Sequence, residues 1–206
     1  MRCLLLLLVC LSACAELRTP QRSSLPPLGL VSRTNDPGRA AIDDAAAAWD
    51  TPGQLAGDPA AMARAAALLE WLAAEIPTAP RWSPIPRQLG YDLGFARTET
   101  RLALGIRADA PAPEVTAALA AAAAAGGDAA ARARALSGSA FAQGPDGTGA
   151  RLAAPGTLSL PPTVTANLRR EVVRLDAVNG WNQNPVRLEE AVRAGERSTG
   201  GLGTFY

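Results

Sequence analysis

The chain has 206 residues, enough for one domain with tails, and its formal charge is +1. Lysine and histidine are absent, and the three cysteines all lie within the first fourteen residues. In the rest of the chain these absences exclude serine–histidine and cysteine–histidine catalysis, histidine or thiolate metal sites, Schiff bases and the lysine of a phosphate-binding loop. We therefore expect no metal and no cofactor, and the near-neutral charge gives no case for nucleic-acid binding.

The first fourteen residues have the order of a secretory signal. Arg2 supplies a positive charge, residues 4–9 form an unbroken apolar run, and small residues follow in the tetrapeptide Leu11-Ser12-Ala13-Cys14. The run is too short to cross a bilayer as a helix. The alternatives are a hydrophobic N-terminal helix that stays with the fold, or an ordinary signal peptide in which the cysteine is incidental.

This tetrapeptide resembles the lipobox of bacterial lipoproteins, and the resemblance covers these fourteen residues only. It implies that residues 1–13 are a cleaved signal peptide and that Cys14 carries diacylglycerol on its sulfur and an acyl chain on the new amino terminus. Three acyl chains, each contributing about 0.8 kcal/mol per buried methylene group, would hold the protein on a membrane. In enteric lipoproteins an aspartate after the cysteine favours the inner membrane, whereas Ala15 stands here. The resemblance therefore implies an envelope protein, with the outer membrane, facing the periplasm, favoured.

Residues 15–35 are rich in proline and show no helical period. We therefore expect residues 14–35 to form a flexible tether behind the lipidated cysteine. The alternative is an extended arm, in which three leucines lie across the domain: Leu25, Leu28 and Leu30.

Two stretches then begin with the same pair, Asp36-Pro37 and Asp58-Pro59, and each has a tryptophan thirteen residues after the aspartate, Trp49 and Trp71. An aspartate at the N-cap accepts hydrogen bonds from free N–H groups, and proline lacks the N–H that would have no partner. The turn between the stretches is short, so we predict an antiparallel helical hairpin in which Trp71 supplies much of the bulk. The similarity is either a duplication or shared capping in an alanine-rich chain.

A third helix is predicted over about residues 85–105, with an apolar face wide enough for the central helix of a bundle. That face comprises Leu89, Leu93, Ala96, Tyr91, Phe95, Leu102 and Ile106. Gly90 and Gly94 are four residues apart and would let another helix approach closely. Charged residues interrupt the segment, which argues against a membrane dimer.

The fourth and fifth helices are predicted over residues 111–125 and 128–136, because prolines and an aspartate stand at their starts. Residues 137–162 are rich in glycine and proline, and we expect a long loop that is either functional or mobile. Its Gly147-Thr148-Gly149 invites a phosphate-binding interpretation. We reject that interpretation, because no strand precedes it and the chain has no lysine.

The sixth helix is predicted over about residues 163–178, where one face is regularly apolar. Asn184-Pro185 starts a seventh helix that ends near residue 194 and carries Val186, Leu188 and Val192. The last residues, 196–206, are rich in glycine, and we expect them to form a flexible tail.

The sixth helix carries the most suggestive charged group, Arg169, Arg170 and Arg174. Arginine binds carboxylates and phosphates through two parallel hydrogen bonds, so this group could hold a lipid headgroup or a cell-wall carboxylate. An ordinary solvated helix face is the favoured alternative. Adjacent Asp43 and Asp44 point about 100° apart on a helix and cannot share one site. The four tryptophans are expected to pack the core, because large side chains are otherwise scarce.

These patterns predict an all-α protein, an irregular bundle of about six or seven short helices that begins with a hairpin, in one domain over residues 36–195. The preferred function is a non-catalytic envelope lipoprotein that is held on the membrane by its lipid and binds a protein or cell-wall partner. The alternative is a carboxylate-dependent cell-wall hydrolase or a small-ligand carrier. A deep cleft with two carboxylates about 5–9 Å apart would favour this alternative. The patterns leave the oligomeric state open.

Overall fold

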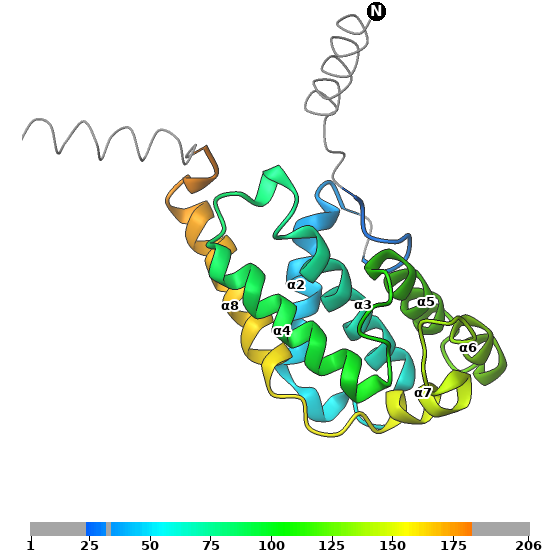
Figure 1. The fold of residues 1–206 in the computed structure, drawn as a ribbon. Coiled ribbons are helices and arrows are strands. Elements are labelled where there is room, and N and C mark those ends of the chain that lie inside the picture. The colour runs from blue at the N-terminus through cyan, green and yellow to red at the C-terminus, as the bar shows by residue number, and fades with distance from the viewer. Residues whose placement is uncertain (1–23, 32–33, 183–206) are drawn as a thin grey trace, which may run out of the picture.

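The computed structural model of the protein describes residues 24–31 and 34–182. In this part of the chain there are seven α-helices, three 3-10 turns and no strand, which confirms the predicted all-α bundle (Figure 1). One isolated antiparallel bridge joins Ile106 to Phe141. Among the described helices, none combines the length and the apolar character that crossing a membrane requires.

The hairpin consists of α2 (Pro37–Asp50) and α3 (Pro59–Glu75), and both predicted caps are present. The Asp36 carboxylate accepts a hydrogen bond from the backbone N–H of Arg39 at 3.1 Å. The Asp58 carboxylate accepts two, at 3.1 and 2.9 Å, from backbone N–H groups in the first turn of α3. Each aspartate thus accepts hydrogen bonds from N–H groups that have no partner within the helix. The proline that follows has no N–H, so it adds no unsatisfied donor.

Four helices form the main bundle, since α4 (Arg87–Leu104) and α8 (Leu160–Ala177) pack beside the hairpin. In chain order α2, α3, α4 and α8 run down, up, down and up in Figure 1, and α8 closes the ring by packing against both α4 and α2. Neighbouring helices are therefore antiparallel, as in other four-helix bundles.

The central helix is α3, and the prediction that the third helix would be central is wrong. α3 packs against α2, α4, α5 and α7, so twelve of its seventeen residues are buried. In α4, by contrast, Tyr91, Phe95 and Leu102 are 65%, 64% and 79% exposed. Periodicity measures how wide an apolar face is, whereas burial depends on how many neighbours cover it.

A second layer of three helices, α5 (Ala112–Ala124), α6 (Ala129–Ala135) and α7 (Gly144–Ala153), covers the outer side of α3. The prediction that residues 137–162 form one long loop is wrong, because α7 lies within this range. Proline is tolerated in the first turn of this helix, and the fully buried Thr148 and Leu152 pack its inner face. Tertiary packing thus overrides the weak helix propensity of glycine.

The start of α8 has a cap that no local pattern predicts. The hydroxyl of Ser159 makes no capping bond. Instead, the Glu99 carboxylate of α4 accepts hydrogen bonds from the backbone N–H groups of Ser159 and Leu160, at 3.1 and 2.9 Å, and from the Ser159 hydroxyl at 2.9 Å. A carboxylate from another helix therefore does what an N-cap side chain usually does.

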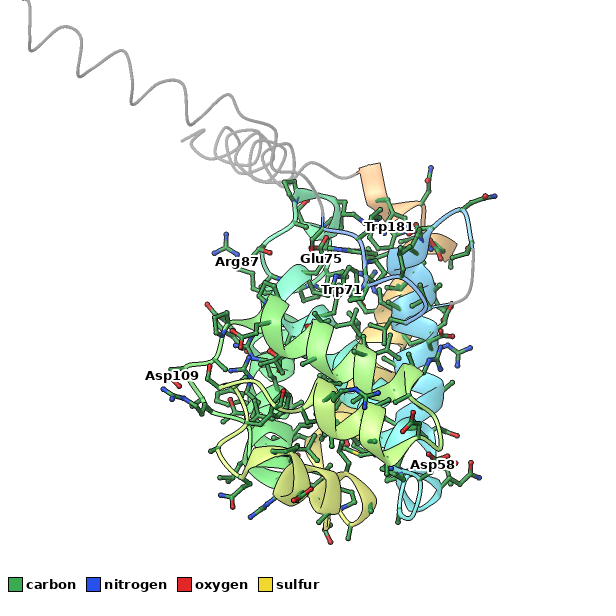
Figure 2. All side chains as sticks on the ribbon, turned by 90° about the vertical axis from the view of Figure 1, so that its right-hand side faces the viewer. Asp58, Trp71, Glu75, Arg87, Asp109 and Trp181 are labelled. Carbon is green, nitrogen blue, oxygen red and sulfur yellow. The ribbon has the colours of Figure 1, made fainter. Side chains whose placement is uncertain are left out.

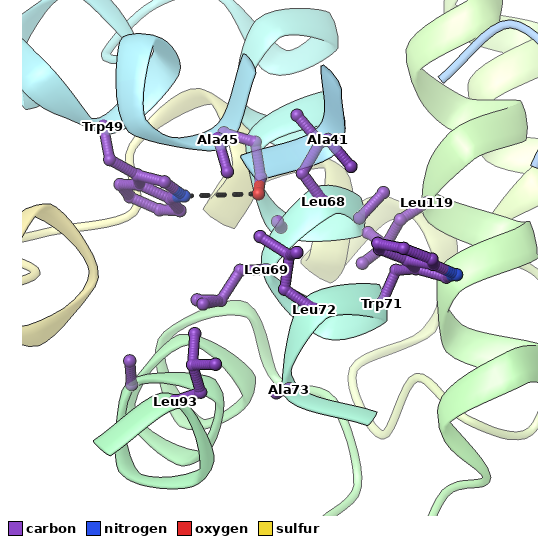
Figure 3. Packing of buried hydrophobic residues seen from close by; sticks show 14 of the residues in the cluster. Ala41, Ala45, Trp49, Leu68, Leu69, Trp71, Leu72, Ala73, Leu93 and Leu119 are labelled. Atoms are coloured by element: carbon purple, nitrogen blue, oxygen red, sulfur yellow. Dashed lines mark hydrogen bonds between the residues drawn. The ribbon is translucent and has the colours of Figure 1, made fainter. Parts of the chain in front are cut away.

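The core contains mainly leucine and alanine with three buried tryptophans, as expected (Figure 3). Trp49 is fully buried, and its indole N–H donates to the Ala65 carbonyl across the hairpin at 3.3 Å. Trp71 is also buried, but Figure 3 shows it beside Leu119 of α5. The hairpin interface is thus filled by Trp49, and Trp71 serves the interface with the second layer.

The described part of the predicted tether, residues 24–31, lies on the domain as an arm. Leu30 is only 2% exposed, and its carbonyl accepts a hydrogen bond from the Arg64 guanidinium at 3.0 Å. The Ser24 hydroxyl donates to the buried Glu75 carboxylate at 2.9 Å. Of the three leucines of the arm interpretation, only Leu30 packs on the domain, since Leu25 and Leu28 are 70% and 104% exposed. Cys14, the signal peptide 1–13, the predicted helix 184–194 and the tail 196–206 lie outside the described residues.

Candidate functional site

A groove of about 830 Å³ lies between the connection 76–86 and the first half of α4. Its other wall comes from the end of α3 and from the 3-10 turn Pro80–Trp82. We call it the α4 groove and define it by six of the residues that line it: Pro77, Pro80, Arg87, Tyr91, Phe95 and Arg97.

The two glycines of α4 shape the groove in different ways. A Cβ atom on Gly90 would lie 3.3 Å from the Cβ of Pro77, so glycine lets the connection pass close to the helix here. A Cβ atom on Gly94 would meet nothing within 4 Å, so the wall of the groove is open at this residue. The predicted close approach of a second helix is therefore wrong for the described residues: at Gly90 the close neighbour is a loop proline, and no described helix covers Gly94.

Two aromatic side chains stand exposed beside the groove. Tyr91 and Phe95 are four residues apart, which places them on one face of α4. Both are about two-thirds exposed, at 65% and 64%, which is unusual for aromatic residues in a chain with so few of them. Two exposed aromatic rings on one helix face, beside a groove, are the kind of apolar surface that a binding partner can cover.

The charge of the α4 groove has a single sign. Among the described residues that line it there is no aspartate and no glutamate, whereas Arg87 and Arg97 both contribute. Neither guanidinium has an ion pair or a side-chain hydrogen bond with another described residue. The groove therefore combines an apolar, proline- and aromatic-lined surface with positive charges that are available to a ligand.

The end of the described chain packs against the back of this groove. The ring of Trp181 meets that of Trp82 edge to face, with 5.9 Å between centroids and 68° between planes, and Trp82 lines the groove. Arg39 lies 4.7 Å over the Trp181 ring and binds both oxygens of Asp176 at 2.6 and 2.7 Å. Hydrogen bonds from Arg39 and from the Trp181 indole lower the pKa of Asp176. Trp82 and Trp181 thus pack as predicted, and Trp82 also lines the α4 groove.

The predicted arginine group of the sixth helix lies on α8, away from the α4 groove, and its members have neighbours as partners. Arg169 pairs with Asp43 of α2 at 3.1 Å. Arg174 pairs with Glu171 at 2.6 Å, as expected for two residues at i,i+3 spacing on one helix. The remaining member, Arg170, donates to the Asn167 side-chain oxygen. A partner surface on these arginines stays a prediction, but an anionic ligand would have to compete with these contacts.

Asp43 and Asp44 point to different partners, which agrees with the expectation that they do not share a site. Asp44 pairs with Arg64 of α3 at 2.6 Å, whereas Asp43 pairs with Arg169 of α8. Across residues 24–31 and 34–182 no group of three or more carboxylates could hold a metal ion.

A second hollow, of about 160 Å³, is lined by Arg107, Asp109 and Glu114 among others. Asp109 accepts two hydrogen bonds from the Arg107 guanidinium, at 3.0 and 2.7 Å, and these lower its pKa. A general acid of a glycosidase needs the opposite shift, because it must keep its proton near neutral pH. Asp109 therefore lacks the electrostatics of a general acid.

The sequence patterns do not indicate the buried ion pair between Glu70 of α3 and Arg101 of α4. Their side chains are 3% and 7% exposed, and the guanidinium binds both carboxylate oxygens. One Arg101 nitrogen also donates to the carbonyls of Arg107, Ala108 and Ala110 at 3.2, 2.9 and 2.9 Å. The pair fixes the connection between α4 and α5. A possible signal was the lone glutamate in the apolar run of α3, since a buried carboxylate needs a partner.

Comparison with known proteins finds no match for this chain. No protein-family model matches the chain, and neither a curated protein nor a solved structure matches it. We therefore argue function from the residues and the geometry of the chain itself.

Proposed function

We propose that this protein is a lipid-anchored component of the bacterial envelope whose helical domain is a non-catalytic binding module. The observation that carries the binding role is the α4 groove, with its exposed aromatics and two arginines that have no ion-pair partner among the described residues. Cys14 carries the lipid in this proposal, and Ala15 after it favours the outer membrane, facing the periplasm. The membrane is thus one partner and an envelope protein the other.

The chemistry of the groove defines the partner. Apolar side chains fit against Tyr91, Phe95 and the prolines, while a carboxylate fits Arg87 or Arg97. We propose that the ligand is a protein segment that carries both, most simply an amphipathic helix laid along α4. A cell-wall carboxylate would satisfy the arginines but not the aromatic surface.

Of the alternatives, one observation favours a small-ligand carrier: the groove volume of about 830 Å³ lies within the range of small-molecule sites, roughly 300–1,000 Å³. No feature of the groove favours a cell-wall hydrolase. Its reaction needs two facing carboxylates, and no carboxylate lines the described part of the groove.

The anchor is tested by membrane fractionation of Cys14→Ser. We expect this variant to leave the membrane fraction, because Cys14 is the proposed site of acylation. Cys10→Ser is the matched control, since it changes a cysteine that leaves with the signal peptide, and it should stay membrane-bound. Recovery of Cys14→Ser in membranes after a high-salt wash would contradict the anchor.

The binding role is tested in cells with a benzophenone amino acid in place of Phe95. We expect photo-cross-linking to an envelope protein, and we expect Arg87→Glu with Arg97→Glu to abolish it by charge reversal. Arg170→Glu, on the exposed side of α8, is the control and should change nothing. The proposal fails if Phe95 yields only lipid adducts or none, or if Arg170→Glu is as harmful as the groove variants.

A further inference from the structure

The exposed face of α4 has the spacing of a coiled-coil seam. Four exposed residues follow one another at intervals of four, three and four, which is the a and d pattern of a heptad repeat: Tyr91, Phe95, Thr98 and Leu102. At about 100° per residue, these positions lie within about 60° of each other around the helix. Tyr91, Phe95 and Leu102 are 65%, 64% and 79% exposed, so the seam is open to a second helix.

The two edges of this seam differ in charge. On the edge next to the α4 groove, Arg87 and Gly94 occupy the g positions of the heptad. On the opposite edge, next to α8, Asp92 and Glu99 occupy the e positions. Arg87 has no ion pair with another described residue, and Figure 2 shows its side chain directed away from the domain. Asp92 accepts a hydrogen bond from Gln88 of its own helix at 2.8 Å and likewise has no ion pair within the described part of the chain.

These edges fit a second α4 in parallel orientation. In a parallel pair, each g residue faces the e residue of the next heptad on the other helix. Arg87 of one copy then meets Asp92 of the other. Gly94 meets Glu99, whose carboxylate already caps α8, so no charge is left opposite a like charge. An antiparallel pair would set e beside e, and Asp92 would face Asp92 or Glu99 of the other copy, which like charges disfavour.

We propose that two copies of this chain pair along α4 as a parallel dimer with two-fold symmetry. The seam forms the interface, and symmetry makes two ion pairs between Arg87 and Asp92. This inference rests on the proposed function, because it names the helix that lies along α4. It also suits a shared membrane. Glu75 holds Ser24, where the described chain begins, and Figure 2 shows Glu75 at the same end of the molecule as Arg87. A parallel pair therefore leaves both N-terminal segments on one side.

The seam is short, so the membrane matters for its strength. It spans fewer than two heptads, whereas coiled coils that stand out in a sequence sustain at least about three. Two chains that are anchored in one membrane are confined near its surface, which raises their effective concentration for each other. We therefore expect the dimer to form on the membrane.

The test uses the full chain in bacterial membranes, with one cysteine introduced at either end of the seam. A disulfide needs Cα atoms within about 4.4–6.8 Å of each other. Gln88→Cys and Leu102→Cys, each tested alone, should both give a disulfide-linked dimer on mild oxidation, because a parallel pair sets each residue against its own copy. Val173→Cys, on α8 and 58% exposed, is the matched control and should give no more dimer than the parent chain.

Reversal of the edge charges tests the predicted ion pairs. Arg87→Glu should lower the yield of the Leu102→Cys disulfide at least about tenfold, because it places like charges at both symmetric contacts. Combining Arg87→Glu with Asp92→Arg restores opposite charges and should return the yield to near its original level. A double variant that stays as low as the single one would overturn the inference. So would equal cross-linking of Val173→Cys, or a disulfide only between position 88 of one copy and position 102 of the other.

The outcomes separate this inference from the proposed function. Photo-cross-linking from position 95 to a different envelope protein, without any disulfide-linked dimer, would leave the proposed function standing and remove this inference alone. A dimer that passes the charge-reversal test, in cells where Cys14→Ser stays in the membrane, would keep this inference and refute the lipid anchor.

Discussion

Replacing Arg101 by methionine should destabilise the domain more than other single changes of an arginine in the described part of the chain. The side chain is 7% exposed and neutralises Glu70, which is 3% exposed. Methionine keeps much of the aliphatic volume but leaves the Glu70 carboxylate buried without its counter-charge. Removing one partner of a buried ion pair typically costs about 3–5 kcal/mol.

The same change also removes the donor for three carbonyl groups. Those of Arg107 and Ala108 are partly accessible to water, whereas the contact with Ala110 is buried, so an unsatisfied acceptor remains there. Such an acceptor costs roughly 1–3 kcal/mol, which moves Arg101→Met toward the upper part of the range. Domains of this size are stable by about 5–15 kcal/mol in total, so the loss is a large fraction of the free energy of unfolding.

Urea unfolding followed by far-UV circular dichroism measures this effect. With a slope of about 2 kcal/mol per molar urea, a loss of about 4 kcal/mol lowers the midpoint by about 2 M. Arg169→Met is the matched control, because it breaks an ion pair in which both side chains are exposed, at 58% and 63%, and it should change stability by no more than about 0.5 kcal/mol. If both variants unfold within about 0.3 M urea of the parent, Arg101 and Glu70 are solvated and the argument from burial is wrong.

Two further predictions concern the core and the pH dependence of stability. Trp71→Ala should lower the free energy of unfolding by about 3–5 kcal/mol, because it leaves a cavity beside Leu119. The control Arg170→Ala should change it by no more than about 0.5 kcal/mol. If the Trp71 variant unfolds at the same urea concentration as the parent, Trp71 does not stabilise the packing of α5. Burial acts to raise the pKa of Glu99, but hydrogen bonds from the backbone and hydroxyl at the start of α8 outweigh it and lower the pKa below 4.5. This stabilisation is present above pH 4.5 and is lost as the pH falls through the lowered pKa. Glu99→Gln should therefore be less stable than the parent at pH 7 and lose less stability on acidification, and parallel acid-unfolding curves would contradict this cause.

The class of fold and the starts of α2 and α3 are properties of the local sequence. Asp36 and Asp58 cap their helices with their own carboxylates, and each proline fills a position where no N–H is needed. Such contacts join residues within one turn, so a reader of the sequence can recognise them. The same holds for the hairpin, because a short connection leaves the two helices few other arrangements.

Burial and remote pairing were decided by the tertiary structure alone. The sequence does not show that Glu70 lies opposite Arg101, that Glu99 caps a helix sixty residues later, or that α3 rather than α4 has neighbours on most sides. Each of these depends on which helices become neighbours, and that choice sums many weak contacts across the whole chain.

The candidate site has the same origin. Nothing in the local sequence distinguishes the exposed Tyr91 and Phe95 from core residues, because their spacing is that of an apolar helix face. They are exposed because the second layer covers α3 and leaves this face of α4 open, next to the proline-rich connection. The sequence alone excludes every site that needs histidine, lysine or a cysteine after Cys14. The groove, by contrast, exists because of the way the helices pack around α3.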